Sequence, residues 1–201
     1  MLTLRKIAVT GGLSSGKSSV CRLMKSFGAY TVSADEIVHQ LLSPHTELGK
    51  QIVTIFGQDI LKGDHFDRSE IAKRAFGNLD KLHQLEALLH PAVLKEVEHQ
   101  YKTLLTSTPF PLFVAEIPLL FEIKAERWFD QVVVVVASDS LCRNRFKASS
   151  NQSDDQFFLR TQRQLPIEEK MQKADYLIKN NGSLEDLKNQ VKILYQTLIT
   201  N

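Results

Sequence analysis

Apolar residues along the chain either form short continuous runs or recur every three to four positions. The continuous runs lie at 7–10, 30–32, 111–117, 131–137 and 174–178. Runs of this length predict buried strands of a parallel sheet, and the spacing between them predicts amphipathic helices. The order of elements therefore predicts an α/β fold, a doubly wound sheet of five parallel strands with ligands at the carboxyl ends of the strands.

The segment 36–108 is too long for an ordinary crossover. A helix joining two parallel strands needs about a dozen residues, whereas roughly seventy lie between the second and third predicted strands. A structureless loop of that length is uncommon in a compact domain. The segment therefore predicts an inserted helical subdomain, and the pair His90-Pro91 predicts a rigid helix break within it.

The stretch 148–156 (ASSNQSDDQ) is polar and rich in turn-forming residues, which predicts a mobile loop. Four arginines bracket it, at positions 143, 145, 160 and 163. Arginines beside a mobile loop would move with it as it closes over a bound anion, although a solvated helix face is the alternative. We expect residues 148–164 to form a lid. Residues 1–35, 109–147 and 165–201 are expected to form the core.

The first strand and the helix after it enclose a phosphate-binding motif. Residues 11–19 (GGLSSGKSS) match G-x-x-x-x-G-K-[ST] with the flanking elements that the motif requires. Glycines let backbone N–H groups approach phosphate oxygens, and the helix start adds a positive dipole end. Lys17 is predicted to bridge the β- and γ-phosphates and Ser18 to ligate Mg²⁺. The predicted nucleotide contacts are Gly12, Leu13, Ser14, Ser15, Gly16, Lys17, Ser18 and Ser19.

Two carboxylates follow predicted strands. Asp35 comes after the second strand, which we expect to lie beside the first, so it would orient an acceptor hydroxyl next to the γ-phosphate. On local sequence alone it serves equally well as the cap of a helix starting at Glu36. Glu116, at the end of the third strand, would contact Mg²⁺ through water or lie in solvent.

Composition narrows the classes of function. The formal charge is only +2, which argues against a nucleic-acid partner. The apolar run 132–137 is too short to span a bilayer, and the N-terminus leads directly into a strand without room for a signal peptide. Cys21 and Cys142 lie far apart, as expected for reduced, buried thiols of a cytoplasmic protein. The six histidines fit no zinc pattern, and the guanine-reading Asn-Lys-x-Asp of GTPases is missing.

Several motifs occur in one order over essentially the whole chain. After the glycine-rich loop come Ser33-Ala34-Asp35, Phe66-Asp67-Arg68, Leu89-His90-Pro91, residues 117–122 (IPLLFE), Ala174-Asp175 and Asn180-Asn181-Gly182. In this conjunction the chain resembles the dephospho-CoA kinases.

The resemblance implies transfer of a phosphate from ATP, with Mg²⁺, to the 3′-hydroxyl of dephospho-CoA. It implies a nucleotide core, a helical CoA-binding domain at 36–108 and a lid, in a monomer or weak homo-oligomer. By resemblance, Asp35, Lys17 and Arg145 are catalytic, and Asn181 and Gly182 lie near the adenine. The implied acceptor-binding residues are Arg68, His90, Pro118, Leu119, Leu120 and Glu122.

The chain departs from the family pattern at two positions. Ser33 stands where an aspartate is usual, and Ser149 stands where a second lid arginine is usual. Lys147 or Arg143 would have to substitute for that arginine, and a lysine cannot reproduce a bidentate phosphate contact. Two other functions stay open: a kinase for another nucleoside or nucleotide, and a non-enzymatic ATP-binding regulatory module.

Overall fold

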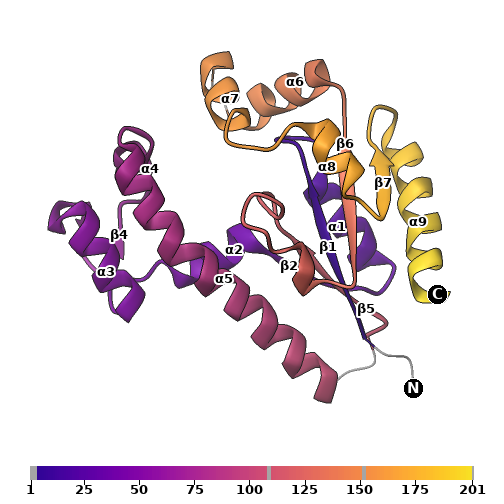
Figure 1. Cartoon of the computed structure of the whole chain (residues 1–201), viewed down its shortest axis with the longest axis horizontal. Helices are drawn as coiled ribbons and strands as arrows, with labels where there is room; N and C mark the ends of the chain where they lie inside the picture. The colour runs from indigo at the N-terminus through magenta and orange to yellow at the C-terminus, as the bar shows by residue number, and fades with distance from the viewer. Residues whose placement is uncertain (1–3, 108–109, 151–152, 201) are drawn as a thin grey trace. The chain divides into compact units, whose positions relative to one another are not determined.

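The computed structural model describes residues 4–107, 110–150 and 153–200 (Figure 1). The chain separates into two compact units. The first comprises Met1–Ser33 and Thr103–Asn201, and the second comprises Ala34–Lys102.

The first unit contains a parallel five-stranded sheet, as predicted. Its strands are β1 (Arg5–Gly11), β2 (Tyr30–Ser33), β5 (Leu112–Glu116), β6 (Gln131–Val136) and β7 (Tyr176–Lys179). Their order in the sheet is β2-β5-β1-β6-β7. The central strands are buried on both faces, which is why they read as unbroken apolar runs in the sequence.

The position of β2 differs from the prediction. We expected β2 beside β1, but β5 lies between them and pairs with both. Ser33 at the end of β2 is opposite Glu116 of β5, which in turn is opposite Val9 of β1. The physical reason is burial. All five residues of β5 are buried, which suits an interior strand, whereas only one of the four residues of β2 is buried, which suits an edge strand.

Two helices pack on the sheet around a shared apolar core. They are α1 (Lys17–Ser26) and α9 (Leu184–Thr200). Val20 and Met24 of α1 and Val191 of α9 have no exposed surface and belong to the core cluster of the sheet. Ser183 caps the start of α9, because its hydroxyl accepts the Asp186 N–H at 3.1 Å.

The segment predicted as a mobile loop is largely helical. Helix α6 (Asp139–Ser150) extends through its first half, and α7 (Asp154–Thr161) begins in its second half. Positions 151–152 lie outside the described residues. Figure 1 shows α6 and α7 side by side, and the rings of Phe146 and Phe157 pack edge to face at 5.5 Å between them. Polar composition was misleading because serine and aspartate here cap a helix and cover its surface, as Ser153 does for α7.

After α7 the chain forms the short helix α8 (Ile167–Gln172), with Pro166 at its N-cap. A short 3₁₀ helix, η2 (Glu126–Trp128), precedes β6.

The second unit is mainly helical, as predicted. Its elements are α2 (Ala34–Leu41), α3 (Glu47–Phe56), η1 (Gln58–Ile60), β3 (Leu61–Lys62), β4 (His65–Phe66), α4 (Arg68–Phe76) and α5 (Leu79–Ser107), whose last residues belong to the first unit. The small antiparallel hairpin β3–β4 was not predicted. Ile52, Phe56, Ile60, Phe66 and Ile71 form the centre of the apolar core of this unit.

The helix break predicted at His90-Pro91 is wrong, because α5 is one continuous helix of 29 residues with Pro91 in its interior. Proline removes one backbone N–H, so the carbonyl of Ala87 loses its helical partner. The apolar residues spaced at helical intervals on both sides of Pro91 stabilise the helix by more than the loss of this one hydrogen bond destabilises it.

Within the described ranges, no helix combines the length and apolar character that crossing a membrane requires. Cys21 and Cys142 are free and buried, as expected from their spacing. Burial raises the pKa of both thiols, that of Cys21 well above its ordinary value.

Candidate functional site

The loop between β1 and α1 has a backbone that requires glycine. Gly16 has φ 101° and Ser14 has φ 56°, both in the left-handed region. A Cβ on Gly11 would lie 2.1 Å from the carbonyl oxygen of Val135. The loop therefore lies directly against β6 and delivers the chain to the N-terminus of α1, where backbone N–H groups favour an anion.

Lys17 is held against this loop. Its side chain is buried, with 7 % exposure, and its Nζ donates to the carbonyl of Gly12 at 2.7 Å and to that of Gly11 at 3.3 Å. The hydroxyl of Ser15, also buried, has no hydrogen-bond partner in the structure. A fixed ammonium and a buried hydroxyl that still needs a partner are suited to the oxygens of a phosphate chain.

Ser18 and Glu116 form the next part of the site. The Ser18 hydroxyl donates to Glu116 Oε1 at 2.8 Å, and Glu116 is 8 % exposed. The interpretation of Glu116 as a solvent-exposed carboxylate is therefore wrong. A hydroxyl beside a carboxylate offers the hard oxygen donors that Mg²⁺ prefers, so the residues present fit this ion.

Arg145 of α6 points toward the same loop. Its Nη2 donates to the carbonyl of Asn180 at 3.1 Å and its Nη1 to that of Ser15 at 3.5 Å. The side chain of Asn180, 6 % exposed, donates from Nδ2 to the carbonyl of Ser15 at 2.8 Å. The sequence prediction included Arg145 but missed Asn180, whose burial no local sequence signal reveals.

Asn181 and Gly182 follow β7 at the same end of the sheet. Asn181 Oδ1 accepts the N–H of Ser138 at 2.7 Å and so ties the two segments that follow β6 and β7. A Cβ on Gly182 would lie 2.7 Å from the Asp186 carboxylate. These two residues therefore fix the turn after β7, and their contact with adenine stays a prediction.

The segment 117–122 forms a compact turn after β5. The carbonyl of Pro118 accepts hydrogen bonds from Thr10 Oγ1 at 3.2 Å and Lys170 Nζ at 3.3 Å. Leu120 has no exposed surface and Leu119 is half-buried. The side chain of Leu120 thus holds the turn in place.

Glu122 is engaged within the protein. Its Oε1 accepts Lys170 Nζ at 2.8 Å and the N–H of Leu165 at 2.8 Å. Lys170 is fully buried, so this ion pair is shielded from solvent and fixes the chain between α7 and α8 to the turn. Binding of an acceptor by Glu122 stays a prediction.

The remaining predicted residues belong to the second unit. Helix α2 begins at Ala34, so Asp35 lies inside its first turn and is not the N-cap that the alternative required. Arg68 contacts the ring Nδ1 of His39, and its Nη2 donates to the carbonyl of His39 at 2.9 Å. His90 lies within α5. Their roles toward an acceptor stay predictions.

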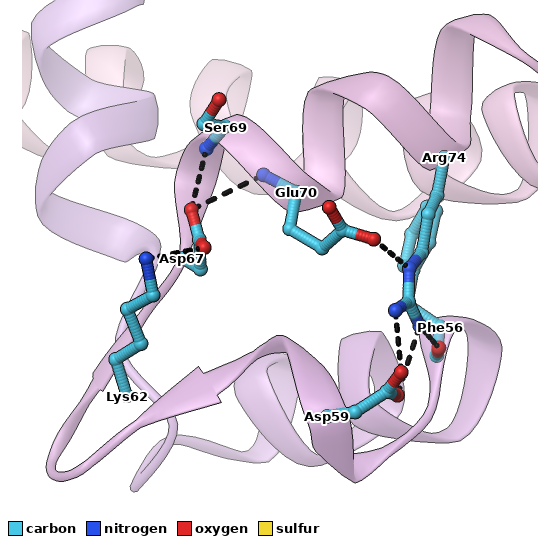
Figure 2. Close-up of polar contacts among 7 residues, drawn as sticks. All are labelled: Phe56, Asp59, Lys62, Asp67, Ser69, Glu70 and Arg74. Carbon is cyan, nitrogen blue, oxygen red and sulfur yellow. Dashed lines mark hydrogen bonds and ion pairs between the residues drawn. The ribbon is translucent and has the colours of Figure 1, made fainter.

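Figure 2 shows the contacts that cap the start of α4. Asp67 is the N-cap, and its Oδ1 accepts the N–H groups of Ser69 at 3.1 Å and Glu70 at 3.2 Å. Lys62 of β3 pairs with Asp67 at 2.7 Å and lowers the pKa of that carboxyl. This cap fixes the start of α4 and therefore the direction of Arg68, the first helical residue.

A second set of contacts in Figure 2 is centred on Arg74. Its guanidinium donates to Glu70 Oε1 at 2.6 Å, to the Phe56 carbonyl at 2.8 Å and to both carboxylate oxygens of Asp59. The hydrogen bonds from Arg74 lower the pKa of Asp59. They join the end of α3 and η1 to α4.

The two candidate substitutes for the missing lid arginine pair with carboxylates. Lys147 contacts Asp154 at 2.7 Å, and Arg143 contacts Asp139 at 2.9 Å. Ser149 donates its hydroxyl to the carbonyl of Phe146 within α6. That Lys147 or Arg143 contacts a phosphate stays a prediction. Across the described ranges, no cluster of three or more His, Cys, Asp or Glu side chains could hold a metal ion.

Comparisons with known proteins agree on one family. The family model described as dephospho-CoA kinase matches residues 5–186. A dephospho-CoA kinase of Protochlamydia amoebophila is 47 % identical over 199 residues, and one of Chlamydia abortus is 43 % identical over 198 residues; each alignment covers 98 % of both chains. The solved structure of dephospho-CoA kinase from Campylobacter jejuni is 28 % identical, covers 98 % of both chains and has a TM-score of 0.73.

Proposed function

Because the chain belongs to the dephospho-CoA kinase family, we propose that it transfers the γ-phosphoryl group of ATP to the 3′-hydroxyl of dephospho-CoA. The products are coenzyme A and ADP. The observation that carries the proposal is a glycine-lined loop with a buried lysine and a Ser18–Glu116 pair, in a chain that matches the family over nearly its whole length.

The first unit supplies the nucleotide site. Residues 12–19 hold the phosphates through backbone N–H groups, and Lys17 places its charge between the β- and γ-phosphates. Arg145 adds a second cation where negative charge spreads over the γ-phosphoryl oxygens. Asn181 and Gly182 border the adenine.

Mg²⁺ enters with ATP and offsets the charge of the β- and γ-phosphates when bound. Ser18 would hold it directly and Glu116 through water. The pair is a hydroxyl and a carboxylate 2.8 Å apart, a donor set that suits this ion.

The acceptor is assigned to the helical insertion at 36–108 and to residues 118–122. Arg68 and His90 bind dephospho-CoA, and Asp35 takes the proton from its 3′-hydroxyl. The new O–P bond forms as the bond from the γ-phosphorus to the β–γ bridging oxygen breaks, and ADP leaves with that oxygen. Residues 148–164 form the lid that excludes water.

The test is ATP-dependent conversion of dephospho-CoA to coenzyme A by the purified protein. Phosphate release in the absence of acceptor and turnover of a nucleoside panel are measured alongside. Formation of coenzyme A with little activity on the panel supports the proposal. Turnover of a nucleoside but not of dephospho-CoA, or ATP binding without any transfer, would overturn it.

Location and assembly complete the proposal. We place the protein in the cytoplasm, as its two free, buried thiols favour. We propose a monomer or weak homo-oligomer with no nucleic-acid or membrane partner, which light scattering over a range of protein concentrations checks.

A further inference from the structure

We propose that Asn180 is a positioning residue for the ATP site: its side-chain amide sets the orientation of the Ser15–Gly16 peptide and so aims the phosphate cradle. The inference rests on the proposed function, since it assigns a role within the same nucleotide site. Asn180 touches neither reacting group and acts through the loop.

The contact itself is specific. Asn180 Nδ2 donates to the carbonyl of Ser15 at 2.8 Å, between residues 165 positions apart in the chain. In a planar trans peptide the C=O and the following N–H point in opposite directions. Holding the Ser15 carbonyl toward Asn180 therefore turns the Gly16 N–H to the other side of the peptide.

The loop needs such a restraint because its backbone has unusual freedom at this peptide. Ser14 and Gly16 flank Ser15 with φ of 56° and 101°. Glycine populates both signs of φ readily, so the loop sequence alone does not fix the peptide orientation. A Cβ on Gly16 would lie 2.1 Å from Asn180 Nδ2, which shows how closely the amide packs against this backbone.

Asn180 is itself fixed by its backbone. Its N–H donates to the carbonyl of Val136 at 2.8 Å, at the end of β6, and its carbonyl accepts Arg145 Nη2 at 3.1 Å. The residue is 6 % exposed. One buried residue thus connects the sheet and the arginine proposed to face the γ-phosphate, through its backbone, with the phosphate-binding loop, through its side-chain amide.

Two substitutions test whether the hydrogen bond donated by the Asn180 side chain is required. Asn180→Asp keeps the shape but points a carboxylate oxygen at a carbonyl, which removes the hydrogen bond and adds repulsion. Asn180→Ala removes the amide altogether. We expect each variant to weaken ADP binding by calorimetry about tenfold or more, because a buried carbonyl left without its donor is costly.

A pH profile separates positioning from simple packing. A protonated aspartic acid can donate to the Ser15 carbonyl, and burial near phosphates raises the pKa of such a group. The ADP-affinity deficit of Asn180→Asp relative to wild type should therefore shrink from about pH 8 to about pH 5.5. The deficit of Asn180→Ala should stay constant.

Two control variants guard against loss of folding. Asn189→Ala removes an asparagine from an exposed position on α9, and Ile178→Val trims a buried methyl group from β7, two residues before Asn180. Both should bind ADP like wild type, even where Ile178→Val lowers the melting temperature. The Michaelis constant for dephospho-CoA should change less than twofold in Asn180→Ala.

The outcomes are distinguishable. If wild-type protein binds ADP but makes no coenzyme A, the proposed function fails while the role of Asn180 is still measured by binding. If Asn180→Ala and Asn180→Asp bind ADP as tightly as wild type, or lose affinity only in proportion to their unfolded fraction, the positioning role is overturned.

Discussion

At the scale of single residues, the site depends on side chains that are buried although they are polar or charged. Lys17, Glu116 and Asn180 are each less than a tenth exposed. Burial of such groups is unfavourable unless each is hydrogen-bonded, and each has a partner in the loop or in the first turn of α1. Their positions are therefore fixed before a nucleotide arrives.

Lys17→Ala should lower kcat by a factor of about 10³ or more, because it removes the cation that we propose to lie between the β- and γ-phosphates. Steady-state formation of coenzyme A is the measurement. Lys25→Ala, at an exposed position near the end of α1, is the matched control and should retain wild-type activity. A kcat near wild type in Lys17→Ala would contradict the role in phosphate binding.

Asp35→Asn should reduce kcat by about 10² or more while ADP affinity changes little, since a base acts on the acceptor proton and not on the nucleotide. Kinetics and calorimetry together give both quantities. Glu36→Gln changes the neighbouring exposed carboxylate and serves as the control. Loss of nucleotide affinity without loss of kcat would instead assign Asp35 a purely structural role.

At the scale of elements, short helices are placed by a few side-chain contacts. Phe146 and Phe157 join α6 to α7, and Leu13 of the phosphate-binding loop packs against the same cluster. The Arg74 and Asp67 contacts do the equivalent for α3, η1 and α4 (Figure 2). The contacts of Phe157 and those of Arg74 can each be tested with a single variant.

Phe157→Ala should raise ATP hydrolysis relative to phosphoryl transfer, because a lid that is poorly packed on α6 admits water. The ratio of phosphate release to coenzyme A formation measures this effect. Phe158→Ala, at a neighbouring ring that is 56 % exposed, should leave the ratio unchanged. An unchanged ratio in Phe157→Ala would count against residues 148–164 as a lid.

Arg74→Met should change how stability depends on pH. Arg74 lowers the pKa of Asp59 from its ordinary 3.8, so the ion pair stabilises the fold above about pH 4 and this contribution is lost as the pH falls through the lowered value. Urea midpoints measured from about pH 7 to about pH 3 should fall less steeply in Arg74→Met than in wild type. Lys73→Met, at the exposed neighbouring position, should follow wild type; identical slopes in all three proteins would refute the assignment.

At the scale of the whole molecule, the two substrates are assigned to different compact units. The nucleotide site is assigned to the unit formed by Met1–Ser33 and Thr103–Asn201, and most of the acceptor site is assigned to Ala34–Lys102. This division gives a prediction that does not depend on turnover.

ADP should slow amide hydrogen exchange at residues 11–19 and 180–182, whereas dephospho-CoA should slow exchange within 34–102. Bound ligand stabilises the segments that it contacts against local opening. Exchange followed by mass spectrometry measures both. The acceptor assignment would be lost if dephospho-CoA left 34–102 unchanged while still being turned over.

The sequence by itself determined the elements whose signal is local. Residues 11–19 between an apolar run and an amphipathic helix predicted the phosphate-binding loop, and the apolar runs predicted the five parallel strands. Burial held for the central strands, whereas the edge strands β2 and β7 each have one buried residue. The order of motifs from Ser33 to Gly182 indicated the family that the comparisons show. These features follow from the periodicity of side chains and from the backbone freedom of glycine, which act over a few residues.

Tertiary structure decided what depends on distant partners. It inserted β5 between β1 and β2, carried α5 through Pro91, and turned a polar stretch into the ends of α6 and α7. It also buried Glu116 against Ser18 and Asn180 against Ser15. Strand neighbours and buried hydrogen bonds are chosen by the packing of segments far apart in the chain, and no local pattern records that choice.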